Sequence, residues 1–168
     1  EIQAKEHTFA IGATKPEYVI GADDAELTTL TIYKNGKNSD GLIAINPTEL
    51  LGGYFYTIDC NIKTLIIEDG ITIQSNFFKN FAKLNNIIIK DSVSITGDTA
   101  FYWNYNISNL SIGKNLVVTG DDAFGNCKAE TVTIENATIT GDRTLYGAKI
   151  KHLIIKNSTI NSYNMINE

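Results

Sequence analysis

A short pattern of residues recurs along most of the chain at a nearly constant interval. Thr-Gly-Asp occurs at 96–98, 119–121 and 140–142, each time after two short stretches in which apolar residues alternate with polar ones. Repeats of this size are typical of solenoids, because one unit is too short to bury its own apolar face and must stack on its neighbours. The repeat therefore predicts a rod of stacked coils rather than a closed globular core.

Three apolar positions recur in phase within each repeat. The first marks the end of one alternating stretch, at Ile67, Ile89, Ile112, Ile134 and Ile155, with intervals of 21 to 23 residues. The second ends the next alternating stretch, at Ile73, Ile95, Val118, Ile139 and Ile160. The third is a larger residue, at Phe78, Phe101, Phe124, Leu145 and Met165. Alternation with a period of two predicts two short strands per unit with one face inward, and the many Ile, Val and Thr residues suit such strands.

The Thr-Gly-Asp turn suggests a role for each of its residues. Gly97, Gly120 and Gly141 are expected to supply a backbone angle that other residues resist. Asp98 and its counterparts then stand where the N-cap of a helix would be, so one or two turns of α or 3-10 helix are expected before the next strand.

These residues resemble a known family. The pattern Leu-x-Ile, Val-x-Ile, Gly-Asp-x-Ala-Phe, with Gly125-Asn126-Cys127 after the Phe, is similar to the BspA-like class of bacterial leucine-rich repeats. The resemblance spans about residues 64–160. It implies a curved, right-handed leucine-rich-repeat solenoid that is β-rich overall, has parallel strands, is exported to the cell surface, and serves in adhesion or partner recognition.

The repeat also divides the chain into four parts within one domain. Residues 1–26 do not follow it and are expected to form an N-terminal cap, with candidate strands at 7–11 and 18–20. Residues 27–63 read as one long first unit with an insertion that includes a short helix over 46–53. Residues 64–160 hold the regular repeats, and 161–168 form a thin C-terminal end.

Charge and composition exclude some functions. The net charge is −5 with a pI near 5.0, which argues against nucleic-acid binding because that requires clustered Lys and Arg. No apolar run approaches the roughly 20 residues of a membrane-spanning helix, so no transmembrane segment is expected. The chain starts at Glu1 instead of Met, so we interpret it as a mature or trimmed form whose signal peptide or lipid anchor has been removed.

The two cysteines occupy equivalent places in coils three steps apart. Cys60 and Cys127 each lie seven residues before a first-strand mark. Coils about 4.8 Å apart would separate them by about 14 Å, well beyond the roughly 7 Å between Cα atoms that a disulfide allows. Two free, buried thiols are therefore predicted.

Side chains on the outer face of the first strands suggest two further features. Glu68 is expected to face Lys90 and Glu135 to face Lys156 on adjacent coils, which would help to fix the register. The outward positions in the middle of these strands are Ile66, Ile88, Ser111, Thr133 and Ile154. A face with three isoleucines could contact a partner or a second copy.

An aromatic group supplies the candidate contact residues. Tyr102, Trp103 and Tyr105 lie in a coil lengthened by one residue, and Tyr54 and Tyr56 lie two coils earlier. Exposed Tyr and Trp are frequent at binding hot spots and also stack on sugar rings. The alternative is that these rings pack over the convex side of the solenoid.

No residue pattern indicates a catalytic or metal site. His7 and His152 lie near opposite ends of the rod, and no Ser, Cys or carboxylate cluster accompanies either one. A ladder of Asp98, Asp121 and Asp142 could in principle bind Ca²⁺, but N-capping explains each of them. We therefore predict no enzyme activity, no cofactor and no metal.

The sequence thus favours a non-enzymatic, exported module that binds protein or glycan partners. One alternative is a structural solenoid that self-associates through its C-terminal coil, where an uncovered strand would invite pairing. A carbohydrate-active enzyme is a third alternative.

Overall fold

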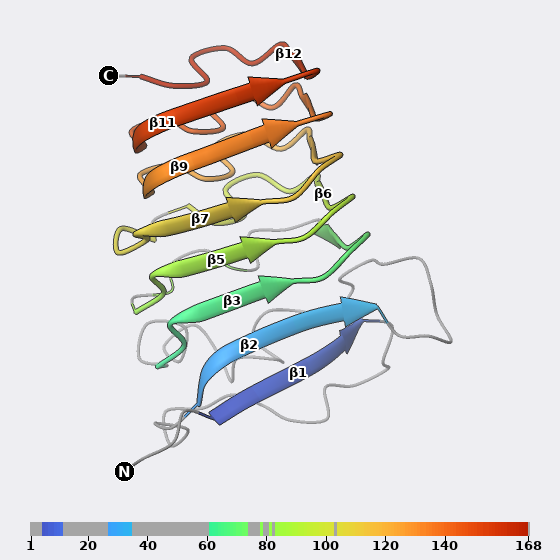
Figure 1. The fold of residues 1–168 in the computed structure, drawn as a ribbon, viewed down its shortest axis with the longest axis vertical. Coiled ribbons are helices and arrows are strands. Elements are labelled where there is room, and N and C mark those ends of the chain that lie inside the picture. Colours follow the sequence, from blue (N-terminus) through green and yellow to red (C-terminus); the bar gives the residue numbers. More distant parts are fainter. Residues whose placement is uncertain are drawn as a thin grey trace.

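A computed structural model describes residues 5–11, 27–34, 61–73, 78, 81, 83–102 and 104–167. These residues form a stack of parallel coils that rises from the N-terminal to the C-terminal end of the molecule (Figure 1). From β3 onward, each coil contributes one strand to a first face and a two-residue strand to a second face. The predicted leucine-rich-repeat solenoid, rich in parallel strands, is confirmed.

The first face is a parallel sheet that is continued by a second, smaller one. Its strands, in spatial order, are β1 (Lys5–Ile11), β2 (Leu27–Lys34), β3 (Thr64–Ile67), β5 (Asn86–Ile89) and β7 (Asn109–Ile112). Next to β7 lie β9 (Lys128–Glu135) and β11 (Lys149–Lys156), which pair with each other in a two-stranded sheet (Figure 1). In this register Ile67 pairs with Ile89, Ile89 with Ile112, and Ile134 with Ile155. The predicted marks therefore stand side by side.

The second face is a continuous ladder of five short parallel strands. They are β4 (Thr72–Ile73), β6 (Ser94–Ile95), β8 (Val117–Val118), β10 (Thr138–Ile139) and β12 (Thr159–Ile160). Ile95 pairs with Val118 and Ile139 with Ile160. The apolar member of each strand points inward, as the alternation predicted.

A column of aromatic rings fills the third side of the interior. The rings of Phe78 and Phe101 stack with centroids 5.4 Å apart, and those of Phe101 and Phe124 with centroids 5.0 Å apart. All three side chains are buried. Stacked rings one coil apart supply dispersion energy beyond the apolar area that they bury. The large residue of each repeat is therefore a core residue, as predicted.

The glycines of the turn have a different role from the one predicted. Among the described residues, the left-handed backbone angle falls two positions later, at Thr99, Asp122 and Arg143, and not at Gly97, Gly120 or Gly141.

The reason for glycine is the close approach of adjacent coils. A Cβ at Gly120 would lie 2.2 Å from the carbonyl oxygen of Gly97, and one at Gly141 would lie 2.0 Å from that of Gly120. Both distances are far below ordinary van der Waals contact. Only glycine, which has no Cβ, therefore fits at these two positions. The glycines thus set the spacing of the stack.

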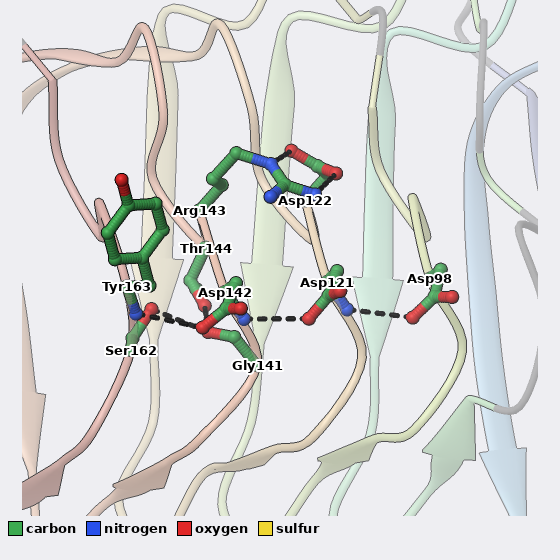
Figure 2. Close-up of polar contacts among 9 residues, drawn as sticks. All are labelled: Asp98, Asp121, Asp122, Gly141, Asp142, Arg143, Thr144, Ser162 and Tyr163. Atoms are coloured by element: carbon green, nitrogen blue, oxygen red, sulfur yellow. Dashed lines mark hydrogen bonds and ion pairs between the residues drawn. The ribbon is translucent and has the colours of Figure 1, made fainter.

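The aspartates of the turn cap the neighbouring coil instead of a helix (Figure 2). The amide of Asp121 donates to Oδ1 of Asp98 at 2.8 Å, and the amide of Asp142 donates to Oδ1 of Asp121 at 2.7 Å. The amide of Tyr163 donates to Oδ1 of Asp142 in the same way. After each Asp the described chain forms hydrogen-bonded turns, without a helix among the described residues. The prediction of N-capped helical turns was wrong because the unpaired amide belongs to the next coil.

The N-terminal part of the chain is only partly described. The predicted strand at 7–11 is β1, which pairs in parallel with β2, so residues 1–26 contribute a strand to the main sheet. Ile32 in β2 pairs directly with Ile67 in β3, so the long unit keeps the register of the repeats. The predicted strand at 18–20 and the predicted helix at 46–53 lie outside the described residues.

The expected charge pairs are arranged differently. Glu135 and Lys156 are register neighbours, but the carboxylate of Glu135 pairs with Lys114 of the preceding coil, at 3.8 Å. The other ion pairs of the described residues are Arg143–Asp122 and Lys151–Glu130, and Glu68–Lys90 is not among them. The Arg143 guanidinium holds Asp122 through two hydrogen bonds, from Nε and Nη2, and these raise the pKa of Arg143 further.

Candidate interaction site

Two of the five predicted contact residues lie in the described part of the chain. Tyr105 is 60% exposed, and Tyr102 is half-buried. Tyr54, Tyr56 and Trp103 lie outside the described residues, so their placement in a contact surface stays a prediction. We call residues 101, 102 and 104–107 the aromatic turn.

A buried asparagine holds the aromatic turn in place. Asn104 is 1% exposed and its side-chain amide makes three hydrogen bonds. Its Nδ2 donates to the carbonyls of Phe78 at 2.7 Å and Phe101 at 2.9 Å, and its Oδ1 accepts from the amide of Phe81 at 2.6 Å. These bonds tie the turn to the preceding coil and satisfy polar groups that would otherwise be buried without partners. The turn that carries Tyr105 is therefore preorganised.

The sequence held no signal for this role of Asn104. The chain has 18 asparagines, and the position three residues after the large apolar residue is Phe81, Cys127 or Ala148 in the other coils, so no polar residue recurs there. Its importance follows only from the proximity of three main-chain groups in the folded protein.

Tyr102 is placed by the next coil. A Cβ at Gly125 would lie 2.4 Å from Cε2 of the Tyr102 ring, so glycine at this position leaves space for the ring. Tyr102 therefore packs against the neighbouring coil at Gly125. Tyr105 is the described aromatic side chain of this turn that projects into solvent.

The first face carries the outward column that the sequence suggested. Ile66, Ile88 and Thr133 are half-buried there, while Ser111 and Ile154 are exposed. The column is thus most accessible near the C-terminal end, where Ile154 is 41% exposed.

A shallow hollow of about 440 Å³ lies where β9 and β11 begin. Its lining includes three lysines, Lys128, Lys149 and Lys151, together with Glu130 and Ile150. Lys128 and Lys149 are direct register neighbours, which is an unfavourable arrangement of like charges in a parallel pair. Glu130 neutralises Lys151 at 2.9 Å, so the other two lysines give this end of the sheet a positive surface.

The groups that could support chemistry are placed in structural roles. Cys127 is a buried free thiol, and burial raises its pKa to about 11, so it stays protonated and unreactive at neutral pH. Cys60 lies outside the described residues. Within the described part of the chain, no group of three or more His, Cys, Asp or Glu residues could hold a metal ion. The carboxylates of the aspartate ladder accept hydrogen bonds from main-chain amides, as shown in Figure 2.

Comparison with known families agrees with this geometry. The model of the BspA type leucine rich repeat region matches residues 49–167 in six copies. The chain belongs to this family. Neither the curated proteins nor the solved structures contain a significant match to it.

As a BspA-type leucine-rich repeat, the chain has the scaffold of a protein-interaction module, a fold that is typically non-enzymatic. Proteins of this type are typically found at cell surfaces. In the part of the chain that the structure describes, no helix is long and apolar enough to cross a membrane.

Proposed function

We propose that this BspA-type repeat is an exported recognition module that binds protein or glycan partners at the cell surface or outside the cell. The family supports the general role, and the aromatic turn supports the place of contact. The proposal rests on one observation: Tyr105 is exposed on a turn that the buried side chain of Asn104 holds in place through hydrogen bonds.

Preorganisation is the physical reason for choosing this turn. A binding loop that is already ordered loses less conformational entropy when a partner docks, so more of the contact energy is available for affinity. A tyrosine offers apolar area, a hydroxyl group and only two side-chain torsions to restrict. Tyr54, Tyr56 and Trp103 would enlarge the same contact surface if they lie beside it, and Tyr102 would form its rim.

The test is binding of the purified chain to an array of immobilised glycans and to purified extracellular glycoproteins. Tyr105→Ala should weaken the strongest interaction by about thirtyfold, as expected for loss of a hot-spot side chain of about 2 kcal/mol. The matched control is Tyr163→Ala, which removes an equally exposed tyrosine, 69% accessible, from a different coil. It should leave the interaction unchanged.

Two results would overturn the proposal. Equal effects of both substitutions would show that the aromatic turn is not the contact site. Turnover of a polysaccharide by the purified chain, without stable binding, would favour the carbohydrate-active enzyme instead.

A further inference from the structure

The hollow at the beginning of β9 and β11 concentrates positive charge in an acidic protein. Its lining holds three lysines and one glutamate, a net charge of +2, whereas the whole chain carries −5. We call this site, lined by residues 108, 128–130 and 149–151, the basic hollow. A ligand that enters it meets cationic groups first.

Lys128 and Lys149 are like charges on neighbouring strands. Both side chains are exposed, and register neighbours in adjacent strands lie about 4.8 Å apart. The ion pair of the basic hollow joins Lys151 to Glu130 at 2.9 Å, and neither Lys128 nor Lys149 belongs to an ion pair within the described residues. Like charges on neighbouring strands repel each other. An anion placed between the two ammonium groups would remove this repulsion and contact both of them.

A small core residue lines the basic hollow. Five residues before the first-strand mark, the three preceding coils carry Ile62, Leu84 and Ile107, all fully buried. The coil of β9 carries Ala129 at this position, and a smaller side chain leaves more open space beside the strand. The volume of about 440 Å³ lies within the range of small-molecule sites, about 300 to 1,000 Å³. The hollow therefore has room for part of a ligand and not only for a single ion.

The aromatic turn leads directly into the basic hollow. The amide of Ile107 donates to the carbonyl of Asn104 at 3.3 Å, which places Tyr105 at the corner of a β-turn. The carbonyl of Ile107 accepts a hydrogen bond from the amide of Lys128 at 3.0 Å, and the next residue, Ser108, lines the hollow. Two residues span at most about 7 Å, so the Cα of Tyr105 lies within that distance of the Cα of Ile107. One extended ligand can therefore reach the exposed ring and the lysines together.

The other polar groups of the hollow suit hydroxyl groups better than a peptide backbone. The carboxylate of Glu130 offers acceptors and the ammonium of Lys151 offers donors, and both side chains are exposed. The main-chain amides of Lys128 and Lys149 already donate to carbonyls of the preceding coils, at 3.0 and 2.9 Å. These amides are not available to pair with a peptide strand, so side chains would make the polar contacts.

We propose that the basic hollow is the anion-binding part of the recognition site and that its ligand is an acidic glycan. A carboxylate or sulfate group of the glycan lies between Lys128 and Lys149, while a neighbouring sugar ring stacks on Tyr105. Sugar hydroxyl groups hydrogen-bond to Glu130 and Lys151. This inference rests on the proposed recognition function and adds to it the class of ligand and the residues that select it.

Two pairs of polysaccharides with matched backbones test the class of ligand. Polygalacturonate carries a carboxylate on each sugar and its full methyl ester carries none, and dextran sulfate and dextran provide the same comparison for sulfate. The acidic member of at least one pair should bind the full 168-residue chain about tenfold more tightly than the neutral member, and added salt should weaken the binding. The pair that shows the difference identifies the anionic group. Equal affinities within both pairs would overturn the proposal.

The lysines are tested by combining Lys128→Gln with Lys149→Gln. Loss of two charged donors should weaken binding of the acidic polysaccharide about tenfold and leave binding of its neutral counterpart unchanged. The matched control combines Lys63→Gln with Lys90→Gln, which removes the same charge from two exposed lysines of other coils. Thermal unfolding without ligand verifies that both variants fold. Equal weakening by the two combinations would contradict the proposal, because net charge and not the hollow would then attract the polysaccharide.

The remaining outcomes separate this inference from the proposed function. Glycan binding that depends on Tyr105 but not on ligand charge or on the two lysines would refute the inference and leave the proposed function standing. Binding of polyglutamate with the same lysine dependence, without binding of either acidic polysaccharide, would show that the hollow recognises an acidic peptide instead. If no glycan and no glycoprotein binds, both the inference and the proposed function fail.

Discussion

At the scale of single residues, the repeat depends on main-chain angles that most side chains disfavour. Nine described non-glycine residues have positive φ, and five of them are asparagines. Asparagine tolerates the left-handed region better than most residues because its short polar side chain can hydrogen-bond locally. This explains part of the asparagine content of the chain.

Thr99 is the least suited residue at such a position. Its φ is 55°, and a β-branched side chain resists this angle. Asn164 occupies the position equivalent to Thr99 in the coil two steps after that of Asp122, and the φ of Asn164 is 46°. Thr99→Asn should therefore raise the free energy of unfolding by about 1 kcal/mol. Urea denaturation measures this change, and the control is Thr119→Asn, which lies directly after β8, has no positive φ and should bring no gain.

Cys127 links stability to pH. The pKa of its thiol is raised from 9.0 to about 11 by burial, so the folded state disfavours the thiolate. The stability that the neutral thiol provides is fully present below pH 9, and it is lost as the pH rises from about 9 towards 11. The loss amounts to about 2 to 3 kcal/mol at most.

The measurement is the urea midpoint of the native chain and of Cys127→Ala between pH 8 and 11. The native chain should lose more stability over this range than the variant, whose remaining pH dependence comes from other groups. Parallel curves for the two proteins would show that the thiol does not titrate differently on folding.

At the scale of elements, the turns are held by contacts between coils rather than within them. The ladder from Asp98 through Asp121 to Asp142 fastens each coil to the next at one corner. The tight approach of Gly97, Gly120 and Gly141 fixes the spacing at the same corner.

Removal of one carboxylate should therefore weaken the joint between two coils. Asp121→Ala takes away the acceptor for the amide of Asp142 and should cost about 1 to 2 kcal/mol of unfolding free energy. Asp121→Asn keeps an oxygen acceptor and removes a charge that lies between two others of the same sign, so it should cost much less. Chemical denaturation of both variants distinguishes a hydrogen-bonding role from a charge role, and an equal loss for both would contradict this account.

This corner also shows how far sequence reasoning reaches. The apolar positions could be predicted because alternation along one strand decides which side chains point inward. The roles of the glycines and aspartates in the turn could not, because they depend on atoms of the next coil, about 22 residues away. The same holds for Asn104, whose three partners come together only in the stack.

The candidate contact surface was predictable only in part. The aromatic cluster in a lengthened coil predicted that some of its side chains face out, and Tyr105 is an exposed one. It did not distinguish Tyr102, which packs over Gly125, because that contact is set by the neighbouring coil.

At the scale of the whole molecule, a solenoid has a graded stability. Each interior coil is supported on both sides, while a terminal coil is supported on one. The exposed Ile155 and the partly buried Ile160 show this at the C-terminal end.

Amide hydrogen exchange should therefore be slowest in the middle coils and fastest in the last coil. Amides of β5 and β7 should be among the best protected, and those of β12 among the least. Uniform protection along the chain at low concentration would argue against a stack of separately supported coils.

The central claim is that each segment of 21 to 23 residues forms one coil that lies against the next in parallel register. Nuclear Overhauser contacts between backbone protons in the isotope-labelled chain test it most directly. We expect contacts from Ile73 to Ile95, from Ile95 to Val118, and onward through Ile139 to Ile160, with the pattern of parallel strands. Antiparallel contacts, or none at these separations, would contradict the account.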